Sequence, residues 1–241
     1  MSRCLLPDGQ CGRIGTPCRS GQCIARTLRR LHDKRWRDKL GLFFVEGEDA
    51  VAAATAEPVD LLRAGEDVEA ELLAEVASAA HPPRVVGVYR RADLPGWEDR
   101  DATLALWRLA DPGNVGTLIR TADAFGAAVG LSEGCADPTS PKALRASAGS
   151  IWRVPLGAWD PASNSLLQAT TRIALVAHGG ADLASVDLSG RVAFLLGAER
   201  EGLDPSVPRD AEATIAIQGA ESLNVAATGA IALYELARRS K

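Results

Sequence analysis

The chain has 241 residues, of which 46% are hydrophobic and 24% charged, and its formal net charge is -4. This composition is that of an ordinary globular protein, and the length allows one large or two modest domains with a real core. No apolar run reaches the ~18 residues that cross a bilayer, and no signal-type apolar stretch opens the chain. These features exclude a membrane partner, predict a cytoplasmic protein, and argue against general coating of nucleic acid while leaving room for local basic patches.

Residues 1–23 are rich in Gly, Pro and Ser and contain four of the five cysteines. The intervals between these cysteines contain no C-x-x-C pair, and no histidine lies among them, which is not the pattern of a zinc site. We therefore expect no metal. The segment is interpreted as a flexible Cys-containing tail, or as upstream sequence included by a wrong start site.

A small α/β unit is predicted over residues 24–96. Residues 24–40 carry seven basic side chains against two aspartates, which is typical either of a phosphate-binding helix or of a solvated helix face. Residues 92–102 combine turn residues with charges and are expected to be a linker. The predicted elements are a basic amphipathic helix at Ala25–Lys39 that ends at Gly41, strands at 42–47, 59–65 and 84–90, and helices at 48–56 and 68–80.

A second unit is predicted over residues 102–241, where strands and helices alternate. The runs IALVA and VAFLL are continuously apolar, as in parallel strands covered on both faces. An α/β fold with a parallel sheet is therefore expected. Its predicted elements are strands at 103–110, 128–132, 152–157, 173–180, 192–197 and 213–217, a turn at 111–116, and helices at 117–127, 140–150, 164–171 and 224–239.

Three glycine-containing loops follow strands of the second unit: AHGGAD at 177–182, GAEREGLD at 197–204 and QGAESLN at 218–224. In an open α/β sheet, ligands bind beyond the carboxyl ends of the strands, and glycine lets the backbone approach them closely. Neither a P-loop nor a dinucleotide fingerprint is present. The loops therefore predict a small-molecule site that is neither a triphosphate nor a dinucleotide site.

The stretches DPGNVGTLIRTADAFGA, LLGAEREGL and ESLNVAATGAIALYE resemble, in order and separation, the three signature motifs of the TrmH/SpoU-type RNA ribose 2′-O-methyltransferases of the SPOUT superfamily. SPKALRASAGSIWRVPL resembles the segment that connects them, and RRLHDKRWRDKLGLFFVEGEDAV resembles the start of the family's N-terminal RNA-binding domain. The resemblance implies a C-terminal trefoil-knotted parallel-sheet domain, a smaller N-terminal α/β RNA-binding domain, a homodimer, and S-adenosylmethionine bound in the knot loops.

The resemblance also implies roles for individual residues. Arg120 would reach the ribose and phosphate of the target nucleotide and help to remove the 2′-hydroxyl proton; the alternative is a salt bridge within the helix from Arg120 to Asp123. Glu199 would orient Arg120 or Asn114. Ser222 and Asn224 would serve the substrate and the arginine besides capping the last helix. The catalytic set is thus Arg120, Asn114, Glu199, Ser222 and Asn224.

Two further sets of residues follow. The expected cofactor-binding residues are Ala177, His178, Gly197, Ala198, Gly202, Ile217 and Leu223. The expected RNA-binding residues are Arg29, Arg30, Lys34, Arg35, Arg37, Lys142 and Arg145, for the last two of which exposed helix charge is the alternative.

One departure from the family pattern affects register. Relatives usually carry a proline where this chain has Ala216, and the interval from Gly219 to Ser222 is one residue short. The implied function is S-adenosylmethionine-dependent 2′-O-methylation of RNA, ribosomal RNA being favoured over tRNA because of the N-terminal domain. The alternatives are a tRNA methyltransferase, a non-catalytic RNA-binding paralogue, and an α/β enzyme acting on a small molecule; the last leaves the basic helix unexplained.

Overall fold

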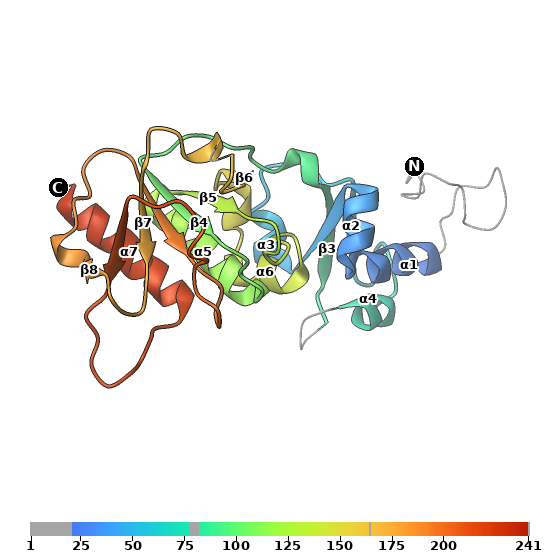
Figure 1. Cartoon of the computed structure of the whole chain (residues 1–241). Coiled ribbons are helices and arrows are strands. Elements are labelled where there is room, and N and C mark those ends of the chain that lie inside the picture. Colours follow the sequence, from blue (N-terminus) through green and yellow to red (C-terminus); the bar gives the residue numbers. More distant parts are fainter. Residues whose placement is uncertain (1–20, 78–81, 164, 241) are drawn as a thin grey trace. The chain divides into compact units, whose positions relative to one another are not determined.

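The computed structural model describes residues 21–77, 82–163 and 165–240. Contacts divide the chain into two units, one holding the described residues up to Leu94 with Thr139–Arg145, and the other Pro95–Pro138 with the residues from Ala146 onward (Figure 1). Most of the predicted tail lies outside the described residues. Its last three residues were assigned wrongly, because helix α1 (Gly21–Leu31) already begins at Gly21.

The first unit is built on a three-stranded antiparallel sheet of order β1-β3-β2. Its core joins the apolar side of α1, including Leu28 and Leu31, to Leu73 of α4 and to Phe44 and Val88 of the sheet. Each predicted strand is present, slightly shortened. The elements are β1 (Leu42–Glu46), β2 (Asp60–Arg63), β3 (Val85–Arg90), α1, α2 (Lys34–Leu40), α3 (Glu48–Ala52), α4 (Ala70–Val76) and the 3-10 turn η1 (Arg91–Asp93).

The predicted single basic helix is in fact two helices. The chain breaks between α1 and α2 at Asp33, whose side chain accepts a hydrogen bond from the Arg35 amide and caps α2. Gly41 then ends α2 with a left-handed φ of 64°. An aspartate competes for helix amides when it lies at a cap, and the expectation of one continuous helix overlooked this.

The second unit holds a seven-stranded sheet of order β6-β5-β4-β9-β7-β10-β8, in which every pairing is parallel. This confirms the expected parallel α/β fold. Strand order does not define how segments thread past one another, so the implied knot stays a prediction. The strands are β4 (Ala102–Leu106), β5 (Ala128–Leu131), β6 (Leu156–Ala158), β7 (Thr171–Leu175), β8 (Ala181–Asp182), β9 (Val192–Leu196) and β10 (Ala211–Thr214).

Several predicted boundaries in this unit were wrong. Asp111 caps α5 by accepting from the Gly113 amide, so the expected turn at 111–116 is the first turn of that helix. The expected helix at 164–171 is only a 3-10 turn in its described part, and β8 was not expected. The remaining elements are α5 (Pro112–Phe125), α6 (Pro141–Ser147), α7 (Val225–Arg239), and the 3-10 turns η2 (Ser150–Trp152), η3 (Ser165–Leu167) and η4 (Leu183–Ser185).

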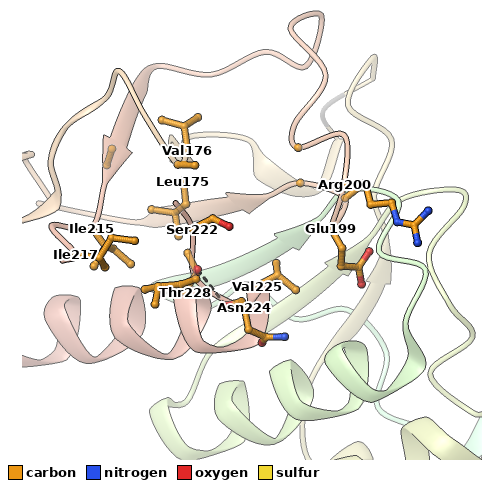
Figure 2. Close-up of a pocket in the computed structure, with 16 residues that line it drawn as sticks. Leu175, Val176, Glu199, Arg200, Ile215, Ile217, Ser222, Asn224, Val225 and Thr228 are labelled. Atoms are coloured by element: carbon orange, nitrogen blue, oxygen red, sulfur yellow. Dashed lines mark hydrogen bonds between the residues drawn. The ribbon is translucent and has the colours of Figure 1, made fainter. Parts of the chain in front are cut away.

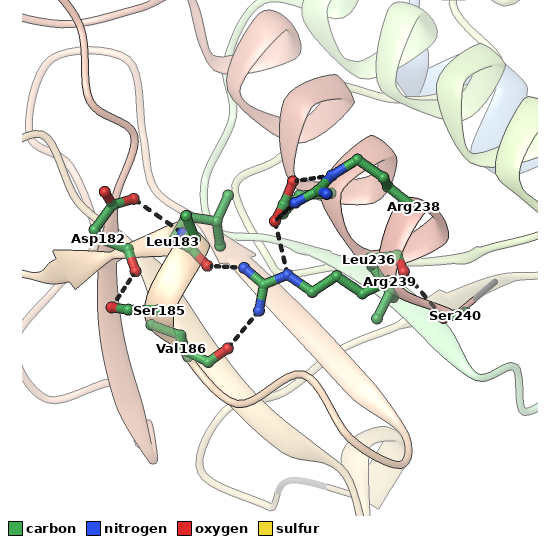
Figure 3. Close-up of polar contacts among 10 residues, drawn as sticks. Asp182, Leu183, Ser185, Val186, Leu236, Arg238, Arg239 and Ser240 are labelled. Atoms are coloured by element: carbon green, nitrogen blue, oxygen red, sulfur yellow. Dashed lines mark hydrogen bonds and ion pairs between the residues drawn. The ribbon is translucent and has the colours of Figure 1, made fainter.

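Helix α7 packs on α5 and on the centre of the sheet. A Cβ added to Gly229 would lie 2.5 Å from Leu118 of α5 and 3.1 Å from Leu196 of β9, so glycine permits this close approach. At the far end, Arg239 donates hydrogen bonds to the carbonyls of Leu183 and Val186, at 2.6 and 2.7 Å, and pairs with Glu235 (Figure 3). Both ends of α7 are therefore fixed, and its N-terminus is held at the carboxyl edge of the sheet.

Candidate active site

A cavity of about 500 Å³ lies at the carboxyl edge of the sheet, where the chain leaves β7, β9 and β10 (Figure 2). Its volume falls within the range of about 300–1,000 Å³ usual for small-molecule sites. The three glycine-containing loops singled out in the sequence all contribute to its wall. The lining residues are Leu175, Val176, Ala177, Gly197, Ala198, Glu199, Arg200, Gly202, Ala213, Ile215, Ile217, Ser222, Leu223, Asn224, Val225 and Thr228.

The cavity includes six of the seven expected cofactor-binding residues. The exception is His178, which is exposed and lines a neighbouring hollow of about 320 Å³ that shares Ala177, Ile215 and Ile217 with the cavity. Four of the lining residues that sequence reasoning missed are Val176, Ile215, Val225 and Thr228. Their positions in the sequence could have identified them, because each lies just past the end of a strand or in the first turn of α7.

The loop after β9 closes on itself. Ala198 and Gly202 exchange two backbone hydrogen bonds of 2.9 Å. A Cβ on Gly197 would lie 2.2 Å from the Gly202 carbonyl carbon and the Leu203 nitrogen, and Gly202 has a φ of 70°. Gly197 is therefore required by the fold of the loop itself, a reason that the sequence pattern did not reveal.

A chain of side-chain hydrogen bonds through Asn114 joins Asn224 and Glu199, which both line the cavity. Asn224 accepts from the amides of Ala226 and Ala227, which caps α7 and turns its Nδ2 toward Asn114. Asn224 Nδ2 donates to Asn114 Oδ1 at 3.1 Å, and Asn114 Nδ2 donates to Glu199 Oε1 at 3.1 Å. The three motifs thus meet through one residue each, and we call this set, Asn224, Asn114 and Glu199, the amide relay.

Glu199 also anchors the loop before α5. Its carboxylate accepts from the backbone amides of Ala110 and Asp111, at 3.3 and 3.2 Å. Partial burial raises the pKa of Glu199, but the hydrogen bonds from Asn114, Asp111 and Ala110 outweigh it, and the net pKa lies below the usual range. Glu199 is therefore an ionised acceptor near neutral pH, and not a proton donor.

The model of the SpoU rRNA Methylase family matches residues 101–234, which contain all three motifs. The chain belongs to the SpoU rRNA methylase family. An uncharacterized tRNA/rRNA methyltransferase of Synechocystis is 32% identical to it over 90% of this chain and 91% of its own length. The 23S rRNA (guanosine(2553)-2′-O)-methyltransferase RlmP of Bacillus subtilis is 31% identical over 86% of this chain and 93% of its own.

Solved structures show the same family fold. The AdoMet-bound rRNA methyltransferase of Sinorhizobium meliloti has a TM-score of 0.79 and 28% sequence identity, covering 90% of this chain and 94% of that one. The likeness in fold therefore extends over nearly the whole of both chains. The segment that matches the family model contains Asn114, Glu199 and Asn224, so the whole amide relay lies within it.

The side chains of Arg120 and Ser222 form no hydrogen bond or ion pair with the described residues. Arg120 is exposed on α5, outside the cavity wall, and makes no hydrogen bond or ion pair there. The alternative salt bridge to Asp123 is wrong, because Asp123 pairs with Arg153 at 2.5 Å. Ser222 lines the cavity but does not cap α7, a role that Asn224 fills alone.

The expected RNA-binding residues of the first unit differ in their surroundings. Arg37 is only 2% exposed and donates to the carbonyls of Leu31 and His32, each at 2.8 Å. Its assignment as a phosphate contact is therefore wrong: the guanidinium caps the end of α1. Arg35 is exposed, Arg29 pairs with Glu75, Lys34 pairs with Asp38, and Arg30 lies over the Trp36 ring at 4.3 Å.

The other two expected contacts lie on α6. Arg145 is 41% exposed and pairs with Glu46 at 3.4 Å, and Lys142 is exposed. Among the residues that the structure describes, no cluster of His, Cys, Asp or Glu could hold a metal ion, and no helix is long and apolar enough to cross a membrane.

Proposed function

We propose that this chain transfers the methyl group of S-adenosylmethionine to the ribose 2′-hydroxyl of an RNA, with ribosomal RNA as the substrate class. The observation that carries the proposal is the amide relay, which joins all three motifs beside one cavity. Two relatives support it through their names: RlmP methylates 23S rRNA at a 2′-oxygen, and the Sinorhizobium protein binds AdoMet. The Synechocystis relative, named for both RNAs, keeps tRNA as the second candidate.

The cavity suits the cofactor in shape and charge. Ile215, Ile217 and Leu223 give it an apolar side that fits an adenine ring. Glu199 places a carboxylate in the cavity wall, where it favours a cationic sulfonium. When bound, the cofactor supplies an electrophilic methyl group, and the expected binding residues are Ala177, Gly197, Ala198, Gly202, Ile217 and Leu223, with His178 at the adjoining hollow.

The side chains around the cavity would position the ribose. The bound cofactor would supply its methyl group to the ribose 2′-oxygen and leave as the neutral thioether, and the 2′-hydroxyl would lose its proton to a nearby acceptor or to water. Arg120, as a permanent cation, stabilises the negative charge that develops at the 2′-oxygen. The amide relay carries no group that titrates near neutral pH, so its task is to hold Asn114 in one orientation toward the substrate.

RNA binding is assigned to basic side chains that solvent reaches. These are Arg29, Arg30, Lys34 and Arg35 of the first unit, with Lys142 and Arg145 on α6. Each phosphate-binding side chain that is removed should lower the salt dependence of log Kd by about 0.7–0.9. An unchanged salt slope after replacing Arg30 and Arg35 would show that these side chains are only solvated and do not bind phosphates.

A homodimer is proposed from an apolar surface on α5 and α7. Ile231 and Tyr234 lie one turn apart on α7 and are 38% and 58% exposed, and Phe125 at the end of α5 is 37% exposed. Burying such side chains against a second copy would stabilise it by about 25 cal/mol per Å². Light scattering should show a dimer, and the double variant Ile231→Lys with Tyr234→Lys should be a monomer. A monomeric native protein would contradict the proposal.

Because its substrate would be ribosomal RNA, we also propose a cytoplasmic location.

The test of function has two parts. Calorimetry should show that S-adenosylmethionine binds without added metal. Labelled methyl should be transferred to ribosomal RNA, at a 2′-oxygen whose position is then mapped. Arg120→Ala should bind cofactor normally yet lose methyl transfer by about 10²–10³-fold. Near-normal transfer by Arg120→Ala would remove its catalytic role. Cofactor and RNA binding with no transfer to any RNA would favour the alternative of a non-catalytic RNA-binding paralogue.

A further inference from the structure

Arg108 has an unusual backbone conformation at the edge of the site. It lies two residues past the end of β4 and has a φ of 51°, in the left-handed region. A residue with a full side chain seldom adopts this conformation, which persists only where the surroundings enforce it and which is concentrated at functional sites. The surroundings of Arg108 must therefore hold its backbone in this conformation.

The loop after β5 holds Arg108 in place. The Arg108 amide donates to Ser132 Oγ at 2.9 Å, and the Ala136 amide donates to the carbonyl of Leu109 at 2.7 Å. A Cβ on Gly134 would lie 3.3 Å from Arg108 Cγ and 3.4 Å from its Nε. The stem of Arg108 thus lies along the bare backbone of Gly134, which restricts where its guanidinium can be.

The guanidinium of Arg108 remains available. The residue is exposed, and with the described residues its side chain forms no hydrogen bond or ion pair. Its charge acts on Asp204 only through space: hydrogen bonds from Ser206 lower the pKa of Asp204, and the charge of Arg108 adds to that effect. The donors of Arg108 are therefore free to bind an anion that reaches this edge.

A second arginine, Arg200, lies on the loop after β9, and Glu199 of that loop is hydrogen-bonded to the segment that follows Arg108. Glu199 accepts from the amides of Ala110 and Asp111, so the segment containing Arg108 and the segment containing Arg200 are tied by one carboxylate. Arg200 is exposed and also lacks a hydrogen bond or ion pair with the described part of the chain. In Figure 2 its guanidinium points away from Ile215 and Ile217, outward from the cavity.

We propose that Arg108 and Arg200, which we call the arginine clamp, bind the RNA phosphates next to the target ribose. A guanidinium matches phosphate with two parallel hydrogen bonds, and two of them on loops tied by Glu199 would fix the backbone beside the amide relay. The clamp rests on the proposed function, since it assumes an RNA at this edge. It would select for a substrate whose backbone continues on both sides of the target nucleotide, over a free nucleoside.

The test compares Arg108→Ala, Arg108→Gly and Arg200→Ala with Arg100→Ala. Arg100 is an exposed arginine two residues before β4, at the opposite edge of the sheet, and pairs with Glu98. Each clamp variant should weaken, by about tenfold, the binding of an rRNA fragment that the native protein binds, and should lower the salt slope by about 0.7–0.9. Arg100→Ala should change neither, and all variants should keep the wild-type affinity for S-adenosylmethionine.

Arg108→Gly separates function from structure. Glycine accepts the left-handed conformation, so this variant should melt at or above the wild-type temperature while still losing RNA affinity. Wild-type RNA binding by Arg108→Gly would overturn the clamp and leave Arg108 as a packing residue. A weaker affinity for S-adenosylmethionine in Arg200→Ala would assign Arg200 to the cofactor and also overturn it. If the native protein bound RNA but transferred no methyl, the proposed function would fail while the affinity measurements still decided the clamp.

Discussion

Asn224→Asp breaks the amide relay at one point and leaves everything else in place. The carboxylate keeps an oxygen for the amides of Ala226 and Ala227, so the cap of α7 survives. Its second oxygen replaces the Nδ2 that donates to Asn114 Oδ1 at 3.1 Å. Two acceptors then face each other. Asn114 cannot correct this by turning over, because its own oxygen would then face Glu199.

The expected magnitudes differ for stability and for activity. A carboxylate at a helix N-terminus gains about 0.3–1 kcal/mol, while the broken hydrogen bond costs about 0.5–1.5 kcal/mol at this exposed position. The free energy of unfolding should therefore change by no more than about 1 kcal/mol. Methyl transfer should fall about 10- to 100-fold, since about 1.4 kcal/mol of lost positioning is already tenfold in rate.

The assay is single-turnover transfer of labelled methyl to the mapped RNA at saturating cofactor, with thermal unfolding measured in parallel. Asn224→Ala is the matched control, because it removes the cap as well and should lose about 1 kcal/mol of stability. Adding Glu199→Gln to Asn224→Asp lets Asn114 turn over and accept from the new amide. The rescue should be partial, since the Asp111 amide still points at the same atom of residue 199.

The outcome that refutes this reasoning is specific. If Asn224→Asp transfers methyl at the wild-type rate while Asn224→Ala does not, the residue serves only as a helix cap. The direction of the relay would then have no part in catalysis.

Three further predictions concern stability and pH. Arg37→Met should lower the free energy of unfolding by about 1–3 kcal/mol, because the carbonyls of Leu31 and His32 at the end of α1 lose their donor, and it should leave the salt slope of RNA binding unchanged in a filter-binding assay. The ion pair with Arg172 lowers the pKa of Asp210 to about 2. Asp210→Asn should therefore lower the free energy of unfolding, measured in urea, by at most about 1 kcal/mol. This loss should be present above about pH 4 and fade as the pH falls toward about 2, and a loss that grew on acidification would contradict the prediction. Gly229→Leu should destabilise the protein by about 1–3 kcal/mol or more through overpacking against Leu118, and an unaltered melting temperature would show that α7 does not pack as described.

The pocket was predictable from sequence because it depends on strand ends. The alternation of apolar runs and glycine-bearing loops placed three loops at one edge of a parallel sheet, and six of the seven expected cofactor residues line the cavity there. The resemblance of the motifs pointed to the same residues. Periodicity failed where a local cap competes with the pattern, as at Asp33, which divides the basic helix, and at Asp111, which turns an expected loop into the first turn of α5.

The amino-acid sequence alone established the family, the parallel sheet and the chemistry-bearing motifs, since these follow from local patterns of residue type. Which polar groups meet became visible only in three dimensions. Charge count could not distinguish Arg37, buried as a helix cap, from the nearby and exposed Arg35. It could not show that Asp123 pairs with Arg153 instead of Arg120, or that Asn224, Asn114 and Glu199 form one relay across 110 residues of chain. A hydrogen bond or ion pair depends on distance and direction in space, and long-range packing sets both.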